Sequence, residues 1–215
     1  LIKTDQLGQV EWSPTFGDST EQIGYSAKPT SSGGYIVCGS SLLINTDDQG
    51  NIIWENSYDF TLRSVVEHDD GGYVIAGYEY FGDPYWNDYL ILVKANADGE
   101  IEWETAYAPM AGEDIDYYGH YISKTSDNGF VVTGYRYLPD EVLLLKYDSE
   151  GQIEWTQTFD TGGMGWGIHD AGYSVEQSLD GGYIIAAVNG WSNRAWLIKT
   201  DPQGNLEWQI NDSDV

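Results

Sequence analysis

The chain has 215 residues, of which 35 are acidic and 9 are basic, and its formal net charge is -26. This balance argues against nucleic acid and anionic membrane surfaces as partners, because binding to phosphate needs clustered lysine and arginine side chains. It is typical of a secreted or cell-surface protein in a salty environment, where a screening length of about 8 Å or less makes the self-repulsion tolerable. An acidic surface that only keeps the protein soluble is the alternative interpretation.

Cysteine content and apolar content exclude two further classes of protein. Cys38 is the only cysteine, so an intrachain disulfide and a cysteine-based metal cluster are excluded. It lies in the apolar run 35–39, where we expect a small buried side chain. No segment reaches the apolar length of a transmembrane helix, and we therefore expect no direct insertion into a membrane.

Two sequence phrases alternate from the first residue onwards. The first phrase begins with an apolar run, continues with Asp or Asn, a Gly three residues later and a Trp four residues after that Gly. The apolar run before the Asp and the alternating run after the Gly predict a β-hairpin with the Asp and the Gly in its tight turn. The five copies of this phrase occupy 1–12, 43–54, 92–103, 144–155 and 197–208.

The tryptophan of each copy stands at a fixed height on the second strand of its hairpin. One position repeated five times indicates one packing role, and burial of such a ring stabilises by roughly 3 to 5 kcal/mol. These tryptophans are Trp12, Trp54, Trp103, Trp155 and Trp208.

The second phrase reads Asp-Asp-Gly-Gly-Tyr-Val-Ile-Ala-Gly at 69–77. Asp-Gly or Asn-Gly before a β-branched run predicts another tight hairpin, and a strand candidate precedes each copy. One unit therefore has four strands in meander order, with tight turns between the first and second and between the third and fourth. The other copies lie at 31–39, 126–134 and 179–187, and the preceding strand candidates lie at 25–28, 63–67, 120–125 and 173–177.

The period of this unit predicts the fold class. Four-stranded units of about 40 to 50 residues with a Gly-rich turn and a fixed Trp are typical of the blades of a β-propeller. Strands that are apolar on both faces agree, because both faces of a blade pack on neighbouring blades. A β-sandwich does not predict the strict repeat, and a solenoid would use shorter periods and would lack the tight hairpins.

We therefore predict one all-β propeller region over 1–215, with four complete blades and one half-blade. The half-blade has a third and a fourth strand without a first and a second, so it needs completion. Either the region is part of a larger propeller with more blades, which we favour, or copies of the chain complete each other. The half-blade covers 1–16, and the blades cover about 17–58, 59–107, 108–159 and 160–210.

The first phrase resembles the tryptophan-docking motif of quinoprotein propellers, in which an Asp and a Gly form the turn between the third and fourth strands. That resemblance implies that each Trp docks against the adjacent blade. The whole chain is also similar to bacterial and archaeal secreted or cell-surface propellers with Asp-Gly-Gly-Tyr-Ile-Val-Ala-Gly and Lys-x-Asp-x-x-Gly-x-x-x-Trp repeats. Every copy here has two residues between Asp and Gly, whereas the quinoprotein motif has three. A quinone cofactor is therefore not implied, and no cofactor is firmly implied at all.

Strand parity places all the long connections at one end of the blades, where binding residues usually lie on a rigid scaffold. They span 17–24, 80–88, 108–119 and 160–172, with shorter ones at 138–141 and 189–194. Their aromatic and acidic side chains suit sugar rings or a protein partner. Rings that only cover the blade ends are the alternative interpretation. The ligand-binding candidates in these connections are Asp83, Trp86, Tyr117, Trp166 and Trp191.

A second group of candidates lies at the start of the innermost strand of each blade. The residues at this equivalent position are polar and vary from blade to blade, and they could line a ligand pocket near the mouth of the axis. A histidine that only packs is the alternative at the third position. The four residues are Tyr25, Arg63, His120 and Tyr173.

Metal binding and catalysis are weakly indicated. Glu113, Asp114 and Asp116 lie close enough in sequence to share a calcium ion, since carboxylate oxygens are hard ligands, but no EF-hand loop is present. No nucleophile motif is present either. A glycosidase would need two carboxylates about 5 to 9 Å apart, and the sequence does not single out such a pair.

The expected function is an extracellular binding or protein-interaction module with a protein or carbohydrate ligand at the long-connection end. An extracellular carbohydrate-active hydrolase or lyase that uses acidic residues of the same end is one alternative. A structural repeat of a surface assembly is another. No enzyme activity is assigned, because the propeller fold hosts many unrelated functions.

Overall fold

The structure is a computed structural model that describes residues 1–17, 23–80, 87–108, 115–160, 169–190 and 192–211. No helix in these ranges is long and apolar enough to span a membrane. The described secondary structure consists of β-strands β1 to β18.

The strands form a two-stranded sheet and four four-stranded sheets. The half-blade contains β1 (Lys3–Thr4) and β2 (Val10–Trp12). The first blade contains β3 (Ser26–Pro29), β4 (Tyr35–Gly39), β5 (Leu42–Thr46) and β6 (Ile52–Ser57). The second contains β7 (Thr61–Glu67), β8 (Tyr73–Tyr80), β9 (Asp88–Ala95) and β10 (Ile101–Tyr107). The third contains β11 (Asp116–Lys124), β12 (Phe130–Tyr137), β13 (Glu141–Tyr147) and β14 (Ile153–Phe159). The fourth contains β15 (Ala171–Gln177), β16 (Tyr183–Asn189), β17 (Arg194–Thr200) and β18 (Leu206–Asn211).

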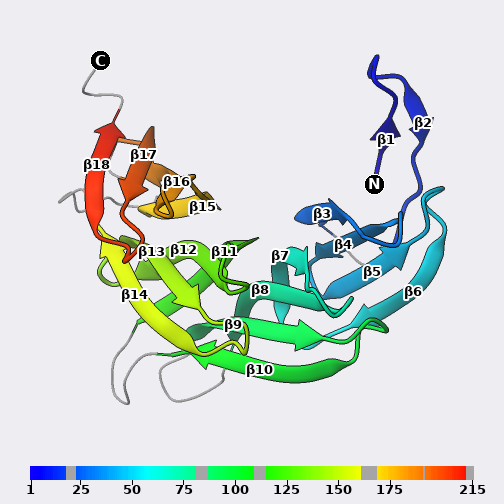
Figure 1. Cartoon of the computed structure of the whole chain (residues 1–215), viewed down its shortest axis with the longest axis horizontal. Helices are drawn as coiled ribbons and strands as arrows, with labels where there is room; N and C mark the ends of the chain where they lie inside the picture. Colours follow the sequence, from blue (N-terminus) through cyan, green and yellow to red (C-terminus); the bar gives the residue numbers. More distant parts are fainter. Residues whose placement is uncertain (18–22, 81–86, 109–114, 161–168, 191, 212–215) are drawn as a thin grey trace.

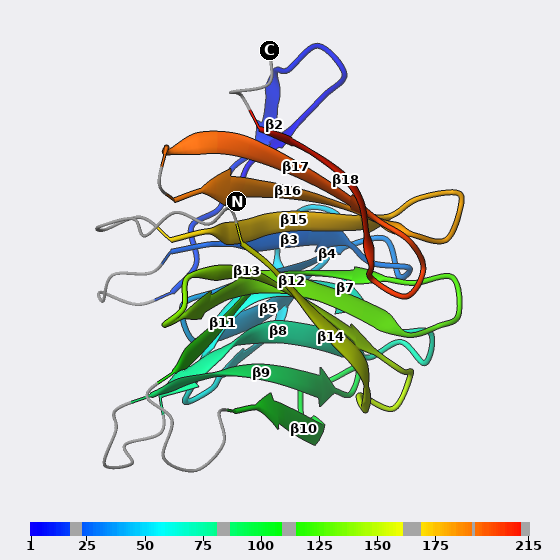
Figure 2. The same ribbon diagram turned by 90° about the vertical axis from the view of Figure 1, so that its left-hand side faces the viewer.

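Every complete blade is an antiparallel meander whose strands pair in chain order. The blades follow one another around an open arc, with β3, β7, β11 and β15 on the concave side and β6, β10, β14 and β18 outside (Figure 1). The prediction of an all-β propeller with four complete blades and a half-blade is thereby confirmed. Figure 2 shows the tight hairpin turns gathered at one side of the molecule, which we call the short-turn end. The opposite side is the long-connection end.

Each of the two kinds of tight turn requires glycine at one position, for a different physical reason. Gly50 has a φ of 82°, which a tight turn between third and fourth strands requires, and Asp47 accepts the N–H of Asn51 at 2.8 Å. At the second glycine of the Asp-Gly-Gly turn, the requirement for glycine comes from lack of space for a side chain. A Cβ on Gly72 would lie 2.3 Å from the carbonyl oxygen of Ala95 and 2.5 Å from Nζ of Lys94, so no larger residue fits.

The core lies between neighbouring blades. Ile36 and Cys38 of the first blade pack in one cluster with Ile75 and Val93 of the second. Two further clusters join the second blade to the third and the third to the fourth. Cys38 is 1% exposed, and this burial raises the pKa of its thiol to about 12.

Four of the five tryptophans of the first phrase contact the turn of the following blade at the short-turn end. Trp208 differs from the expected docking role, because it lies on the last described strand and is 43% exposed. Nε1 of Trp54 donates to the carbonyl oxygen of Ala97 at 2.9 Å, and Nε1 of Trp12 donates to that of Asp48 at 3.2 Å. A Cβ on Gly99 would lie 2.8 Å from the Trp54 ring, so the turn glycine lets the ring approach the backbone. The contact repeats with Trp103 on the Gly151 turn, and with Trp155 on the Gly204 turn.

Candidate functional site

A β-bulge interrupts the innermost strand at the same place in three blades. The pairing register skips one residue between Leu62 and Ser64 of β7, and the skipped residue is Arg63. His120 of β11 and Tyr173 of β15 are skipped in the same way. Such bulges bend the strand and aim the extra side chain away from the ladder, and they are common beside binding sites.

Tyr25 occupies the equivalent position of the first blade. It directly precedes β3, and its N–H donates to the carbonyl oxygen of Cys38 at 2.9 Å. The four predicted inner residues therefore occupy one equivalent position, within or directly before the innermost strands β3, β7, β11 and β15. These strands lie on the concave side of the arc (Figure 1). We call the four residues the bulge row: Tyr25, Arg63, His120 and Tyr173.

Ring contacts connect the members of the bulge row in pairs across blade boundaries. The guanidinium carbon of Arg63 lies 4.1 Å from the ring centroid of Tyr25, a cation–π distance. His120 and Tyr173 stack with centroids 5.0 Å apart and planes at 20°. Tyr25 is 38% exposed and Tyr173 is 53% exposed, so both rings remain open to a ligand.

His120 is held in its neutral form. Burial, and then the positive charge of Arg63, lower the pKa of His120 to about 4, although the contact with Gly172 opposes this shift. Nδ1 of His120 lies 3.1 Å from the carbonyl oxygen of Gly172, which places the single proton of the neutral ring on Nδ1. Nε2 is then a hydrogen-bond acceptor for a hydroxyl group.

A second set of rings adjoins the bulge row at the long-connection end. We call this set the aromatic array; it consists of Tyr78, Tyr118, Tyr135, Tyr137 and His169. Tyr118 and Tyr135 stack at 4.5 Å and 11°, and Tyr135 and His169 stack at 5.2 Å and 2°. His120 joins the array to the bulge row, because its ring also lies 5.3 Å from that of Tyr135. The two sets together span the four complete blades.

Carboxylates fix the orientation of the array. Nδ1 of His169 lies 2.8 Å from Oδ1 of Asp140, and the hydroxyl of Tyr118 donates to Asp88. Burial, and then this hydrogen bond to Asp88, raise the pKa of Tyr118. The N–H of Asp88 in turn donates to Oδ1 of Asp116 at 2.9 Å. The rings are therefore held in place before any ligand arrives.

The other predicted site residues divide into two groups. Tyr117 is 5% exposed and packs edge-on against Tyr107 at 4.7 Å within the core between the second and third blades, so its ring serves packing here. Asp116 lies beside the array. The remaining predictions fall outside the described residues: Asp83, Trp86, Trp166, Trp191, Glu113 and Asp114.

No cluster of three or more acidic, histidine or cysteine side chains suited to a metal ion occurs within the described ranges. The calcium prediction rests mainly on Glu113 and Asp114, which those ranges do not include, so it stays a prediction.

Sequence reasoning missed the tyrosines at the end of the second strands. Tyr78 follows Gly77 in β8, and Tyr135 follows Gly134 in β12. The signal was present as Gly-Tyr-x-Tyr, which ends the second phrase in exactly two blades. Their use as a stacked array depends on contacts between blades, which a sequence period does not reveal.

Comparison with known proteins supports the fold alone. No protein family and no curated protein sequence matches the chain. The structure is similar to BamB from Moraxella catarrhalis (14% identity, 88% of this chain, 50% of that chain, TM-score 0.55). It is similar to the Pan2 WD40 domain from Neurospora crassa (11% identity, 88% of this chain, 50% of that chain, TM-score 0.58). It is also similar to a luciferin-regenerating enzyme (12% identity, 89% of this chain, 64% of that chain, TM-score 0.55). The chain thus spans about half the length of the first two.

These similarities, together with the sheet topology, define the protein as a β-propeller built from sequence repeats. The closer resemblance to secreted repeat propellers and to the quinoprotein docking motif stays a prediction.

Proposed function

We propose that the protein is an extracellular or cell-surface binding module whose ligand contacts the bulge row and the adjoining aromatic array. One observation carries this proposal. The bulge recurs at one position in three blades, and each time it presents a different polar or aromatic side chain: Arg63, His120 or Tyr173. A bulge that served folding alone would not need a different functional group in each blade.

The chemistry of this surface favours a carbohydrate ligand. The exposed faces of Tyr25 and Tyr173 suit the C–H faces of sugar rings. Nε2 of neutral His120 accepts a hydrogen bond from a hydroxyl, and the guanidinium of Arg63 donates several. Tyrosine and arginine are also enriched in protein interfaces, so a protein ligand is the second class to test.

The proposed location rests on charge. A net charge of -26 is tolerable where salt screens it, as it does outside the cell of an organism in a salty environment. The same charge disfavours a nucleic-acid ligand at this surface.

The test uses an array of immobilised oligosaccharides of glucose, xylose, mannose and N-acetylglucosamine. Two variants on the fourth blade form a matched pair, Tyr173→Ala in the bulge row and Trp208→Ala on the outer strand, because both rings are about half exposed. We expect Tyr173→Ala to abolish binding of the sugar that the wild type retains, and Trp208→Ala to leave it unchanged. Thermal unfolding confirms that both variants fold.

Three results would count against the proposal. Equal loss of binding in both variants would show that the ligand does not sit on the bulge row. Binding of no oligosaccharide would reject the carbohydrate class and favour a protein ligand. Release of new reducing ends from a bound oligosaccharide would show that the protein is an enzyme, the alternative that the acidic residues of this end suggest.

A further inference from the structure

The chain has 9 basic side chains against 35 acidic ones, and most of the basic ones pair with carboxylates. In the third blade, Nζ of Lys146 lies 2.9 Å from Asp127 and 2.9 Å from Glu154. We call this three-residue arrangement the lysine clamp. Lys94 in the second blade and Lys199 in the fourth blade each form the same clamp with one aspartate and one glutamate.

Arg63 of the bulge row is an exception to this pairing. Nζ of Lys28, the other basic side chain of the innermost strands that lacks an ion pair, donates to the hydroxyl of Tyr121 at 2.9 Å. The guanidinium of Arg63 forms no ion pair and donates no hydrogen bond to any residue of the described ranges, and its contact is with the face of the Tyr25 ring. Three further basic residues each form an ion pair with a single carboxylate: Lys3, Lys124 and Arg136.

The surroundings of Arg63 leave its positive charge uncompensated. Its neighbours in the bulge row are Tyr25 and His120, and neither carries a negative charge at neutral pH. After burial, the charge of Arg63 is the next cause that lowers the pKa of His120, and no carboxylate of the described residues opposes it. A local positive charge therefore persists on the concave side of a very acidic protein.

The chemistry of a guanidinium indicates what such a charge would bind. Arginine presents five N–H donors in a planar fork, and this fork matches a carboxylate with two parallel hydrogen bonds. The bulge in β7 removes Arg63 from strand pairing, and its side chain is partly exposed. The donors are thus available to an anionic group of a ligand that lies on the bulge row.

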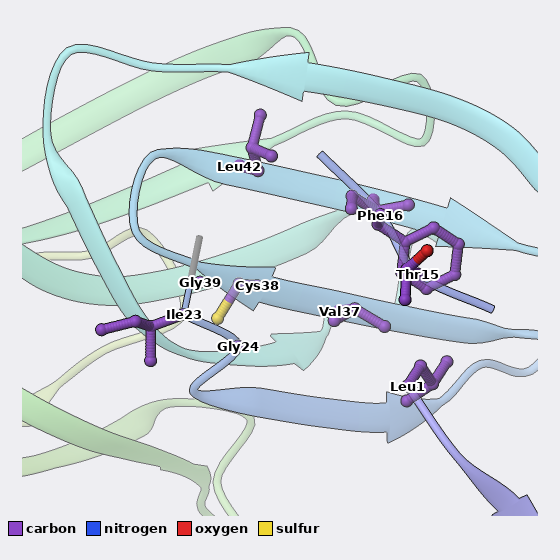
Figure 3. A pocket seen from close by; sticks show the side chains of 10 residues that line it. Leu1, Thr15, Phe16, Ile23, Gly24, Val37, Cys38, Gly39 and Leu42 are labelled. Atoms are coloured by element: carbon purple, nitrogen blue, oxygen red, sulfur yellow. The ribbon is translucent and has the colours of Figure 1, made fainter. Parts of the chain in front are cut away.

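Two hollows elsewhere on the molecule lack this chemistry. An open apolar pocket of about 220 Å³ lies beside Phe16, Val37 and Cys38 (Figure 3). A second pocket of about 310 Å³ lies between β14 and β18, beside Gln157 and Gln209. None of the described residues that line either pocket has a basic side chain. Among these three places, only the bulge row offers a cation to an anionic ligand.

We propose that the bulge row selects an acidic sugar, a uronate, whose carboxylate binds the guanidinium of Arg63. This inference rests on the proposed carbohydrate function and adds the charge of the ligand. The sugar ring lies against an exposed tyrosine of the row, and one of its hydroxyls donates to Nε2 of His120. General attraction does not provide such a preference, because the net charge of -26 repels an anionic ligand.

The test compares oligosaccharides of the same linkage and length that differ in one group, the hydroxymethyl of the neutral sugar or the carboxylate of the uronate. Tetrasaccharides of glucose and glucuronate form one pair, and those of mannose and mannuronate form another. Calorimetric titration measures the dissociation constants at neutral pH and about 0.15 M salt, where a screening length of about 8 Å weakens long-range repulsion. We expect the uronate of at least one pair to bind about tenfold more tightly than its neutral counterpart, since charge-assisted hydrogen bonds are stronger.

Two arginine variants locate the preference. Arg63→Gln removes the guanidinium of the bulge row, and Arg194→Gln removes an exposed guanidinium at the start of β17. Both variants change the net charge by the same amount, so long-range repulsion of the ligand is the same in each. We expect the ratio of neutral to acidic dissociation constants to fall to about one or below in Arg63→Gln and to stay unchanged in Arg194→Gln. Thermal unfolding confirms that both variants fold.

Each contrary result has its own meaning. Equal binding of neutral and acidic oligosaccharides to the wild type would overturn the charge preference and leave the carbohydrate function in place. A preference that persists in Arg63→Gln would overturn the role of this arginine. Binding of no oligosaccharide would reject the carbohydrate function and this inference with it. Binding of a polyglutamate peptide in place of any sugar, lost in Arg63→Gln, would instead assign Arg63 to an acidic protein partner.

Discussion

The two ends of the blades differ in how closely equivalent positions of the repeat match in residue type. At the short-turn end, corresponding positions carry a turn glycine beneath the preceding tryptophan. In the second, third and fourth blades they also carry a clamp of one lysine with an aspartate and a glutamate, whereas the first blade has Asn45 at the lysine position. At the long-connection end, the corresponding position of the innermost strand carries Tyr25, Arg63, His120 or Tyr173. The repeat is thus nearly uniform at the short-turn end and varied at the start of the innermost strand.

This difference has a physical cause. A ring that must pack between two blades at fixed spacing has one acceptable volume, so the same tryptophan solves the problem each time. A bulged residue has no partner in the ladder, so strand pairing does not set its identity, which is open to selection by a ligand. Structure should accordingly depend on the short-turn end, and ligand binding on the long-connection end.

The largest expected effect is on the tryptophan contact. Trp103→Ala should lower the free energy of unfolding by about 3 to 5 kcal/mol, because it opens a cavity beside the Gly151 turn. Urea titration followed by circular dichroism measures this loss. Trp208→Ala is the control, since Trp208 is 43% exposed and should cost less than about 1 kcal/mol. Equal losses in the two variants would disprove the packing role of Trp103.

The turn glycines allow the same contact to be probed from its other side. Gly151 and Gly8 have φ values of 77° and 78°, so alanine strains both turns by about 1 to 2 kcal/mol. At Gly151 the added Cβ would also lie 2.3 Å from the Trp103 ring, whereas at Gly8 it meets nothing within 4 Å. We expect Gly151→Ala to lose a further 1 to 3 kcal/mol or so, from overpacking. Equal thermal shifts in both variants would contradict a close ring contact.

The contribution of His120 to the free energy of unfolding should depend on pH. His120 has a pKa lowered to about 4 by burial and then by Arg63, against about 6.5 in the unfolded chain. Protons therefore bind the unfolded state more strongly in this window. Stability is fully present above about pH 6.5 and declines by up to about 3 kcal/mol as the pH falls toward 4.

The matched variant for this titration is His120→Phe, which keeps a ring at the bulge. Denaturant midpoints measured between pH 7 and 4 should fall less in this variant than in the wild type. The residual fall comes from the titratable groups that both proteins share. An identical pH dependence in both proteins would show that His120 is not held neutral by its surroundings.

The repeat made the fold predictable, because five copies of one phrase and four of another leave little freedom in strand order. The site was only partly predictable. Alignment on the Gly-Tyr step correctly grouped Arg63 with His120, but the bulge that releases both side chains has no sequence signature of its own. The stack of Tyr118 on Tyr135 depends on how far neighbouring strands are offset, which residue period does not specify. The sequence analysis also missed the pairing of Lys146 with Asp127, although the same pairing recurs between Lys94 and Asp70 and between Lys199 and Asp180.

The smallest expected effect concerns that clamp. Lys146→Met keeps the length of the side chain and removes its hydrogen bonds to Asp127 and Glu154, which should cost about 1 to 3 kcal/mol. Burial raises the pKa of Asp127, but hydrogen bonds from Thr125, Lys146 and Gly129 outweigh it and lower that pKa to about 2. This contribution is present above about pH 4, the ordinary range of an aspartate, and is lost as the pH falls through 2.

The variant should therefore lose less stability than the wild type between pH 4 and 2, in addition to its lower stability at neutral pH. Urea midpoints over this range measure both effects. Lys124→Met is the control, because its lysine is 36% exposed and its ion pair with Asp69 should contribute less than about 1 kcal/mol. If both variants behaved alike, the clamp would be no more than a surface ion pair. The uniformity of the short-turn end would then require another cause, with the tryptophan contact as the remaining candidate.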